Sequence, residues 1–87
     1  MRYRSRTDIV ATILESANGG ATKTKIMYKA YLSYAQLKEY LSMLAESGLI
    51  EHIPTERTYK TTEKGLKFIK AASEMSRMTG PMVEVKV

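Results

Sequence analysis

The chain has 87 residues, of which 44% are apolar and 26% charged, and it carries a formal net charge of +5 with a pI near 9.6. This length allows one domain with one modest core, and the composition is ordinary for a globular protein. The chain has no cysteine and one histidine, which excludes a disulfide framework and a thiolate metal site. It has no phosphate-cradling glycine loop and no paired-carboxylate motif, so we expect no enzymatic activity, no metal and no cofactor.

The positive charge favours a polyanionic partner, and it is unevenly distributed. Residues 1–31 carry +4 (six Lys or Arg, two acids), residues 32–61 carry −1 (three and four), and residues 62–87 carry +2 (five and three). No apolar run approaches the ~20 residues that a membrane helix needs. The basic start MRYRSR leads into no apolar signal core. We therefore expect no membrane partner, and a cytoplasmic, nucleoid-associated protein.

The first six residues form a basic segment in which Arg2, Arg4 and Arg6 alternate with a tyrosine and a serine. An extended backbone places alternate residues on one side. We predict that residues 1–6 form an arm that reaches DNA phosphates or the minor groove. The alternative is a solvated terminus without a binding role.

Two helices are predicted next, over residues 7–17 and from about residue 22 or 23 to residue 30. Thr7 or Ser5 can cap the first helix, which carries an apolar stripe of Ile9, Val10, Ile13, Leu14 and Ala17. Three lysines remain for the surface of the second helix: Lys23, Lys25 and Lys29. They can contact phosphates as this helix crosses the DNA backbone, or they can simply form a solvated face.

A third helix is predicted from Ser33, its N-cap, to Gly48, where the chain can turn left-handed. Leu37, Leu41 and Leu44 recur at helical spacing and define its buried face. The opposite face is predicted to carry Tyr34, Gln36, Glu39, Tyr40 and Met43, with Lys38 at its flank. Alternatively, Tyr34 and Tyr40 are residues at the rim of the core. The preceding connector, residues 31–32, is so short that the two helices must cross steeply, as in a helix-turn-helix.

A hairpin is predicted after this helix, with strands at residues 49–53 and 59–61 and a turn at residues 54–58. The apolar residues Leu49, Ile53 and Tyr59 are expected to point inward. Arg57 at the tip and Lys60 beside it are candidates for DNA contact. His52 is interpreted as a surface residue of the strand rather than a ligand or catalyst.

The last predicted helix begins at about Thr62. Leu66, Ile69, Ala72 and Met75 form a seam along one side, and Phe68 lies off that seam. Two apolar surfaces result, so we predict that one packs on the domain and the other on a second copy, giving a homodimer. Alternatively, both are satisfied within one monomer. Residues 76–87 are expected to be a tail. Residues 82–87 alternate apolar and polar side chains and can form an edge strand or a pairing tail, or can equally be disordered.

Two motifs carry a family resemblance: LKEYLSMLAESGLIE (residues 37–51) and YKTTEKGLKFI (residues 59–69). The pattern L…L..L.E.GLI followed by Y..T.KG resembles winged-helix transcription regulators, and more closely the small archaeal winged-helix DNA-binding proteins. The resemblance implies an α+β, mainly α fold over residues 7–75, with a three-helix core, a two-stranded wing and an additional C-terminal helix. It also implies that residues 21–22 pair with the wing and that the last helix dimerises as an antiparallel coiled coil.

The resemblance also implies DNA contacts, from the start of the central helix and from the wing: Ser33, Tyr34, Gln36, Lys38, Arg57 and Lys60. We predict a transcriptional regulator that binds double-stranded DNA as a homodimer. The central helix is less basic than a strong major-groove reader, with no arginine. A winged-helix module that binds a protein partner is therefore kept as the alternative, and RNA binding as a third.

Overall fold

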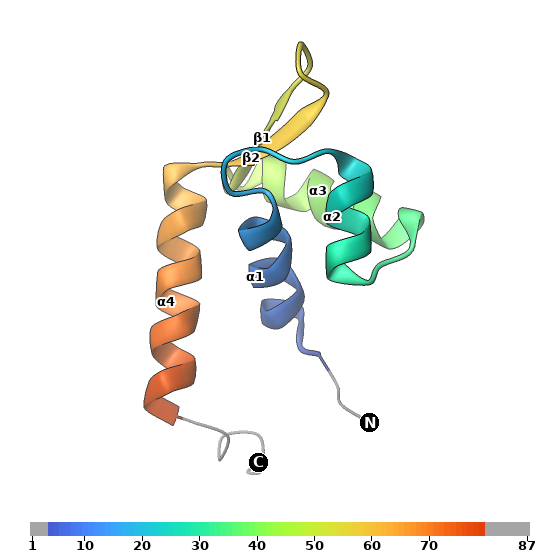
Figure 1. Ribbon diagram of the computed structural model, residues 1–87. Coiled ribbons are helices and arrows are strands. Elements are labelled where there is room, and N and C mark those ends of the chain that lie inside the picture. The colour runs from blue at the N-terminus through green and yellow to red at the C-terminus, as the bar shows by residue number, and fades with distance from the viewer. Residues whose placement is uncertain (1–3, 80–87) are drawn as a thin grey trace.

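The computed structural model describes residues 4–79, which form four helices and one two-stranded antiparallel sheet (Figure 1). In chain order these are α1 (Arg6–Ser16), α2 (Lys23–Ala30), α3 (Tyr34–Glu46), β1 (Ile50–Ile53), β2 (Thr58–Thr61) and α4 (Glu63–Thr79). The predicted α+β, mainly helical class is confirmed. Arg2 and the strand predicted over residues 82–87 lie outside the described residues.

Helix α1 begins one residue earlier than predicted because Ser5 caps it. The Ser5 hydroxyl accepts a hydrogen bond from the Asp8 amide at 3.0 Å, and the Asp8 carboxylate accepts one from the Ser5 amide at 3.2 Å. This reciprocal capping box satisfies two amides that would otherwise lack partners. Arg6 is therefore the first helical residue, and the predicted arm of residues 1–6 is too long.

Helices α2 and α3 are joined by the short connector that the sequence predicted. Thr22 caps α2 by accepting from the Lys25 amide at 3.2 Å. Tyr31 closes α2 in a left-handed conformation with φ 55°, and the Leu32 amide donates to the Met27 carbonyl at 3.2 Å. This pattern ends the helix within two residues and turns the chain into α3.

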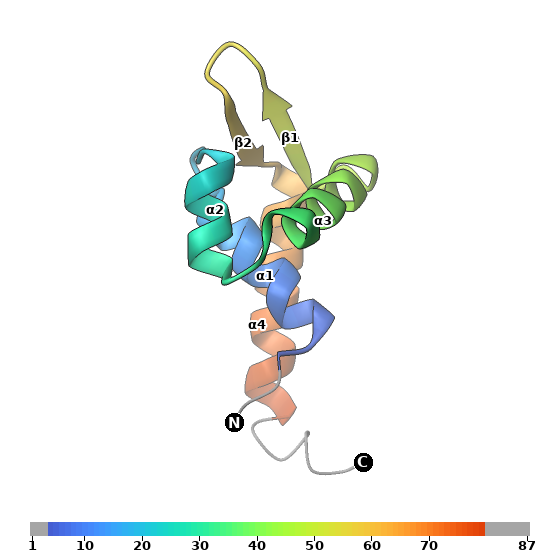
Figure 2. The same cartoon turned by 90° about the vertical axis from the view of Figure 1, so that its right-hand side faces the viewer.

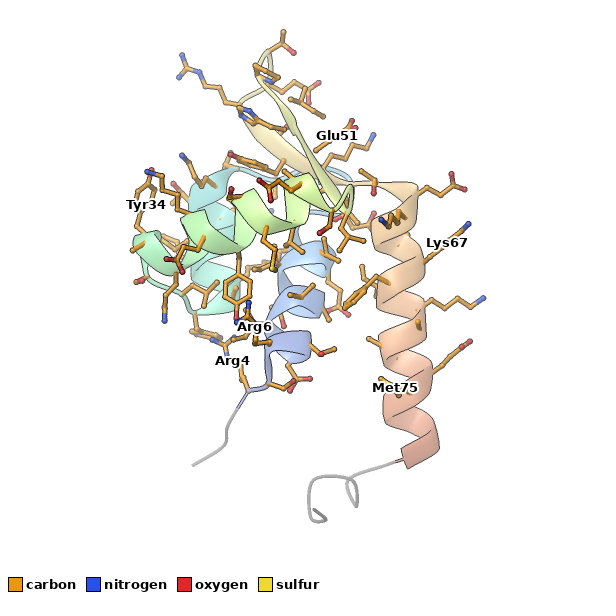
Figure 3. The ribbon with its side chains drawn as sticks, turned by 180° about the vertical axis from the view of Figure 1, so that it is seen from behind. Arg4, Arg6, Tyr34, Glu51, Lys67 and Met75 are labelled. Carbon is orange, nitrogen blue, oxygen red and sulfur yellow. The ribbon has the colours of Figure 1, made fainter. Side chains whose placement is uncertain are left out.

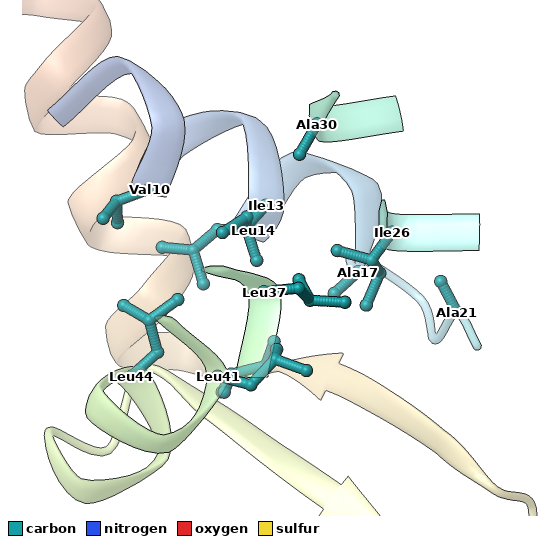
Figure 4. Packing of buried hydrophobic residues seen from close by; sticks show 11 residues of the cluster. Val10, Ile13, Leu14, Ala17, Ala21, Ile26, Ala30, Leu37, Leu41 and Leu44 are labelled. Carbon is teal, nitrogen blue, oxygen red and sulfur yellow. The ribbon is translucent and has the colours of Figure 1, made fainter. Parts of the chain in front are cut away.

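The core lies where α1, α2, α3 and the base of the hairpin meet (Figure 4). Its members are Val10, Ile13, Leu14, Ala17, Ala21, Ile26, Ala30, Leu37, Leu41, Leu44 and Ile50. The predicted buried face of α3 is thereby confirmed. Each fully buried Leu or Ile contributes about 1.5–3 kcal/mol, so this cluster holds the three helices in one arrangement.

The hairpin pairs Ile50 with Thr61 and His52 with Tyr59. Of the residues predicted to point inward, Leu49 and Tyr59 do pack against the core, whereas Ile53 does not belong to it. In this register Tyr59 shares a face with His52 and Ile50. Ile50, the first residue of β1, is only 2% exposed, because the base of the hairpin packs on the helical core.

A third segment joins the hairpin at its base. Ala21 and Tyr59 exchange two backbone hydrogen bonds, of 3.0 and 2.8 Å, which confirms the predicted pairing of this segment with the hairpin. Thr61 is buried, and its hydroxyl donates to the Leu14 carbonyl. The hairpin is therefore fixed to α1 and to the α1–α2 loop.

The T.KG motif is a structural joint between α3 and α4. The Thr62 hydroxyl donates to the Gly48 carbonyl at 2.6 Å and accepts from the Gly65 amide at 3.1 Å. The Lys64 ammonium donates to the Ser47 carbonyl at 2.7 Å. A Cβ on Gly65 would collide with the Leu49 carbonyl oxygen. The start of α4 is thus held against the end of α3.

Helix α4 runs alongside α1 and continues past it (Figures 1 and 2). It ends at Thr79, so the predicted domain end at residue 75 is too early. Phe68 and Ile69 both pack against the domain core, so Phe68 does not form a separate apolar surface as predicted. Leu66 and Met75 are 42% and 55% exposed. Within residues 4–79, no helix is both long and apolar enough to cross a membrane.

Candidate nucleic-acid interface

The helix pair α2–α3 lies on the side of the domain away from α4, and the hairpin projects at the top, with its base beside the start of α4 (Figure 1). Seen from behind, Tyr34 stands at the end of α3 that is remote from α4, whereas Lys67 points outward from α4 on the opposite side (Figure 3). The structure therefore separates the helices α2 and α3, which carry most of the predicted DNA contacts, from the predicted dimerisation helix.

Three cations of the predicted interface lie beside tyrosines. The Lys23 ammonium lies 5.3 Å from the centroid of the Tyr34 ring, and donates to its hydroxyl at 3.4 Å. The Arg4 guanidinium lies 6.0 Å from the Tyr31 ring centroid and donates to the Tyr31 carbonyl at 3.3 Å. Such contacts contribute about 0.5–1 kcal/mol each at exposed sites. They place Arg4 and Lys23 against the helix-turn-helix rather than free in solvent.

Arg6 is held in the same way, over α3. Its guanidinium lies 5.7 Å from the Tyr40 ring centroid and donates to the Met43 sulfur at 3.9 Å. Tyr40 and Met43 are half-buried and pack against the core. Their predicted place on the face opposite the leucines is therefore wrong.

The first turn of α3 exposes Tyr34 and Gln36, as predicted. The other exposed residues of α3 are small or charged: Ala35, Lys38, Glu39, Ser42, Ala45 and Glu46. Residues 35, 38, 42 and 45 recur at helical spacing, which puts them on one stripe. The prediction missed this stripe because it assigned Tyr40 and Met43 to the outer face. Counting positions from Leu37 and Leu41 would have found it.

The first turn of α3 is closed by a second capping box. The Ser33 hydroxyl accepts from the Gln36 amide at 3.1 Å, and the Gln36 side-chain oxygen accepts from the Ser33 amide at 3.0 Å. Bidentate recognition of adenine needs both the oxygen and the nitrogen of a glutamine side chain. Here the oxygen of Gln36 is engaged, so its NH₂ group and the Ser33 hydroxyl hydrogen remain as donors. These donors suit phosphate oxygens better than base edges.

The hairpin carries two cations and two acids. Arg57 sits in the turn with a left-handed φ of 56°, and its amide donates to the Pro54 carbonyl at 3.2 Å. Lys60 is exposed and lies opposite Glu51 in the strand register. Glu56 precedes Arg57 in the turn. The hairpin is therefore electrically neutral overall, and Arg57 is the cation at its tip.

A run of positive charge covers α2 and the start of α3. Residues 16–38 contain four lysines and no Asp or Glu. Lys25 and Lys29 are exposed on α2, and Lys38 is exposed on α3. This acid-free stretch was visible in the sequence but was divided between two charge segments there. Such a positively charged stretch without acids is expected in a protein that binds a polyanion.

Possible metal ligands do not gather in the part of the chain that the structure describes. Within residues 4–79, no group of three or more His, Asp or Glu side chains could hold a metal ion. His52 lies exposed on β1 and stacks on Tyr59, with ring centroids 4.6 Å apart and planes inclined by 24°. Its role is therefore in the hairpin surface, as predicted.

Comparison with known families shows where this arrangement belongs. A family model described as winged helix-turn-helix matches residues 3–80. The chain is a member of the winged helix-turn-helix family. In this family's terms, α2 and α3 are the helix-turn-helix pair, α3 is the recognition helix, and the β1–β2 hairpin is the wing.

A search of solved structures found a similar protein with the same fold. It is Sso10a-2, a DNA-binding protein from Sulfolobus solfataricus, which matches with a TM-score of 0.78 and 22% sequence identity. The match covers 93% of this chain and 87% of that one. At this identity the likeness shows the winged-helix fold alone. No curated protein matches the sequence.

Proposed function

We propose that this winged helix-turn-helix protein binds duplex DNA and acts as a transcriptional regulator in the cytoplasm, associated with the nucleoid. The observation that carries the proposal is the acid-free stretch of residues 16–38, which includes α2, the connector and the first five residues of α3. The similarity to a protein described as DNA-binding supports it. Backbone phosphates would supply most of the affinity, because four lysines face them and no arginine is present on α3.

The contacts divide by element. Lys25 and the Lys23–Tyr34 pair would bind phosphates where α2 crosses the DNA backbone. The donors of Ser33 and Gln36 would bind phosphates at the entrance of α3 into the major groove, with Lys38 one turn further. The wing would place Arg57 on the neighbouring backbone or minor groove. Sequence selectivity would come from the α3 stripe, whose small residues permit close approach to base edges.

Matched lysine variants test the location of the interface. Lys25→Ala with Lys38→Ala removes one exposed lysine from each helix of the helix-turn-helix. Lys67→Ala with Lys70→Ala removes the same charge from α4. Fluorescence anisotropy on a mixed-sequence duplex measures the slope of log K against log salt. The first pair should make this negative slope shallower by about 1.8, at about 0.9 per lost contact. The α4 pair should leave this slope unchanged. Equal effects of both pairs would refute the proposed interface.

We also propose a homodimer through α4. Leu66 is exposed, and it borders a shallow depression between α1 and α4 that is lined also by Glu15, Asn18, Ile69 and Ser73. Ala72 is half-buried beside a second depression of the same seam. A dimer built on this seam would place two recognition helices on half-sites about one helical turn of DNA apart.

Light scattering tests the dimer. Leu66→Glu places a charge in the proposed seam and should convert a dimer into a monomer at micromolar concentration. Lys67→Glu is the matched control, because it puts the same side chain at the next position, which points outward (Figure 3). A wild-type protein that is monomeric at high concentration would contradict this part of the proposal.

A protein-interaction role is the second candidate function. Glu39 and Glu46 are exposed on α3, and Glu51 is exposed on β1. These acids face a duplex unfavourably and would suit a basic protein surface. A pull-down that recovers a stoichiometric protein partner and no nucleic acid would favour this role over DNA binding.

A further inference from the structure

Three tyrosines are exposed within seven residues of the helix-turn-helix. Tyr28 on α2 is 70% exposed, Tyr31 in the connector 84%, and Tyr34 at the start of α3 54%. The large exposed hydrophobic side chains of the described chain are these three, Leu66 and Met75. We call Tyr28, Tyr31 and Tyr34 the tyrosine cluster. Aromatic rings of this size are ordinarily buried in part, so three exposed rings within one short stretch require an explanation.

The backbone of Tyr31 gives no structural reason for its ring. Tyr31 ends α2 with φ 55°, a conformation that glycine or asparagine adopts at much lower cost. Its side chain is nearly fully exposed, so it adds almost nothing to the core. A side chain kept at a strained, exposed position points to a role outside folding.

The charges around the cluster suit a polyanion that also presents flat faces. The Arg4 guanidinium covers one ring and the Lys23 ammonium lies beside another. Lys25 and Lys29 flank Tyr28 in the sequence, and residues 16–38 contain no acid. Cations that follow a phosphate backbone, combined with exposed aromatic rings on which bases stack, are the features of sites that bind single strands.

We propose that the tyrosine cluster binds unpaired nucleotides of single-stranded nucleic acid by stacking. The outer two tyrosines are six residues apart, so the chain between them can span at most about 22 Å. At about 3.4 Å per stacked nucleotide, a strand of about six nucleotides or fewer covers this distance. A duplex cannot use these rings in the same way, because its bases are stacked on one another and present only their edges.

This inference goes beyond duplex binding and does not depend on it. Tyr28 and Tyr31 are not assigned to the duplex interface, whereas Tyr34 is shared through its contact with Lys23. The test therefore changes Tyr28 and Tyr31 and leaves Tyr34 in place.

The test variant is Tyr28→Ala with Tyr31→Gly. Alanine suits the exposed helix position, and glycine relieves the left-handed strain, so the variant should fold at least as stably as the wild type. The matched control is Tyr28→Phe with Tyr31→Phe, which keeps both rings. The probes are fluorescein-labelled dT12, rU12 and a mixed-sequence 20-base-pair duplex, measured by anisotropy at low salt.

The wild type and the phenylalanine control should bind dT12 or rU12 with equal affinity. The Ala/Gly variant should bind the same strand more weakly, by between about 5-fold and 150-fold for each ring that stacks a base. Its affinity for the duplex should not change. The tighter of the two single strands identifies DNA or RNA as the preferred ligand.

Three results would overturn the proposal. They are no binding of either single strand by the wild type, single-strand binding that survives in the Ala/Gly variant, and an equal loss of duplex binding in that variant. Failure of the duplex proposal alone gives a different pattern, in which dT12 or rU12 binds and the duplex does not.

Discussion

Replacing Arg57 by asparagine should change stability and DNA affinity in opposite directions. Arg57 is an arginine in the left-handed region, with φ 56°, at the tip of the wing. A non-glycine residue there costs about 1–2 kcal/mol, and asparagine tolerates this region better than arginine does. Arg57→Asn should therefore raise the free energy of unfolding by about 0.5 kcal/mol. In a domain of this size that corresponds to a rise in Tm of about 2–4 °C.

The same change removes the cation that the wing offers to DNA. Loss of one phosphate contact makes the negative slope of log K against log salt shallower by about 0.9. At 0.1 M salt this corresponds to about eightfold weaker binding of the duplex. Thermal denaturation followed by circular dichroism measures the first effect. Anisotropy titrations of a mixed-sequence duplex at several salt concentrations measure the second.

Arg57→Lys is the control, because it keeps the charge and the backbone strain. It should leave both Tm and the salt slope close to those of the wild type. An Arg57→Asn protein that binds DNA with an unchanged slope would refute the assignment of Arg57 to the interface. A fall in its Tm would refute the assignment of strain to this turn.

Three further substitutions test the contacts that hold α3, the hairpin and α4 in place. Gly65→Ala should lower the free energy of unfolding by about 3 kcal/mol or more, because its Cβ meets the Leu49 carbonyl oxygen. Thr61→Val should lower it by about 1–3 kcal/mol, because the buried Leu14 carbonyl loses the hydroxyl that donates to it. Gln36→Glu should keep the capping box and raise stability by about 0.3–1 kcal/mol through the helix dipole, while weakening DNA binding by its charge.

Chemical denaturation and duplex titration check these three changes. Gly19→Ala is the comparison for Gly65→Ala, since Gly19 has φ 86° but no atom within 4 Å of a built Cβ. A loss at Gly65 no larger than that at Gly19 would contradict the predicted collision with the Leu49 carbonyl oxygen. A neutral Thr61→Val, or a Gln36→Glu protein that binds DNA as tightly as the wild type, would contradict the roles given to those side chains.

Much of the fold could be predicted because local chemistry and long-range packing agree. Ser33 and Thr22 are strong N-caps, and the leucine spacing of α3 matches a helix with one buried face. The T.KG motif was recognised as a family signature. The contacts of this motif could be found only in the structure, because Thr62 and Lys64 donate to carbonyls that lie 14 and 17 positions earlier in the chain.

The errors concern side chains whose burial is set by contacts with another helix or strand. Apolarity alone predicted Leu49 and Tyr59 correctly, but it also placed Ile53 inward and missed Ile50 and Thr61, which pair with each other and are buried at the base of the hairpin. Tyr40 was placed outside because α3 has more apolar residues than one narrow stripe can hold. Arg6 covers Tyr40 from another helix, and sequence spacing within α3 carries no information about that contact.

Backbone NMR with a mixed-sequence duplex tests the duplex-binding account most directly. Spectra of the ¹⁵N-labelled protein at low salt should show DNA-induced shifts at residues 22–25, 33–38 and 53–60. The exposed residues of α4, Lys67 and Lys70 among them, should be unaffected. Shifts concentrated on α4, or no shifts at any residue, would contradict the assignment of the DNA interface to the helix-turn-helix and wing.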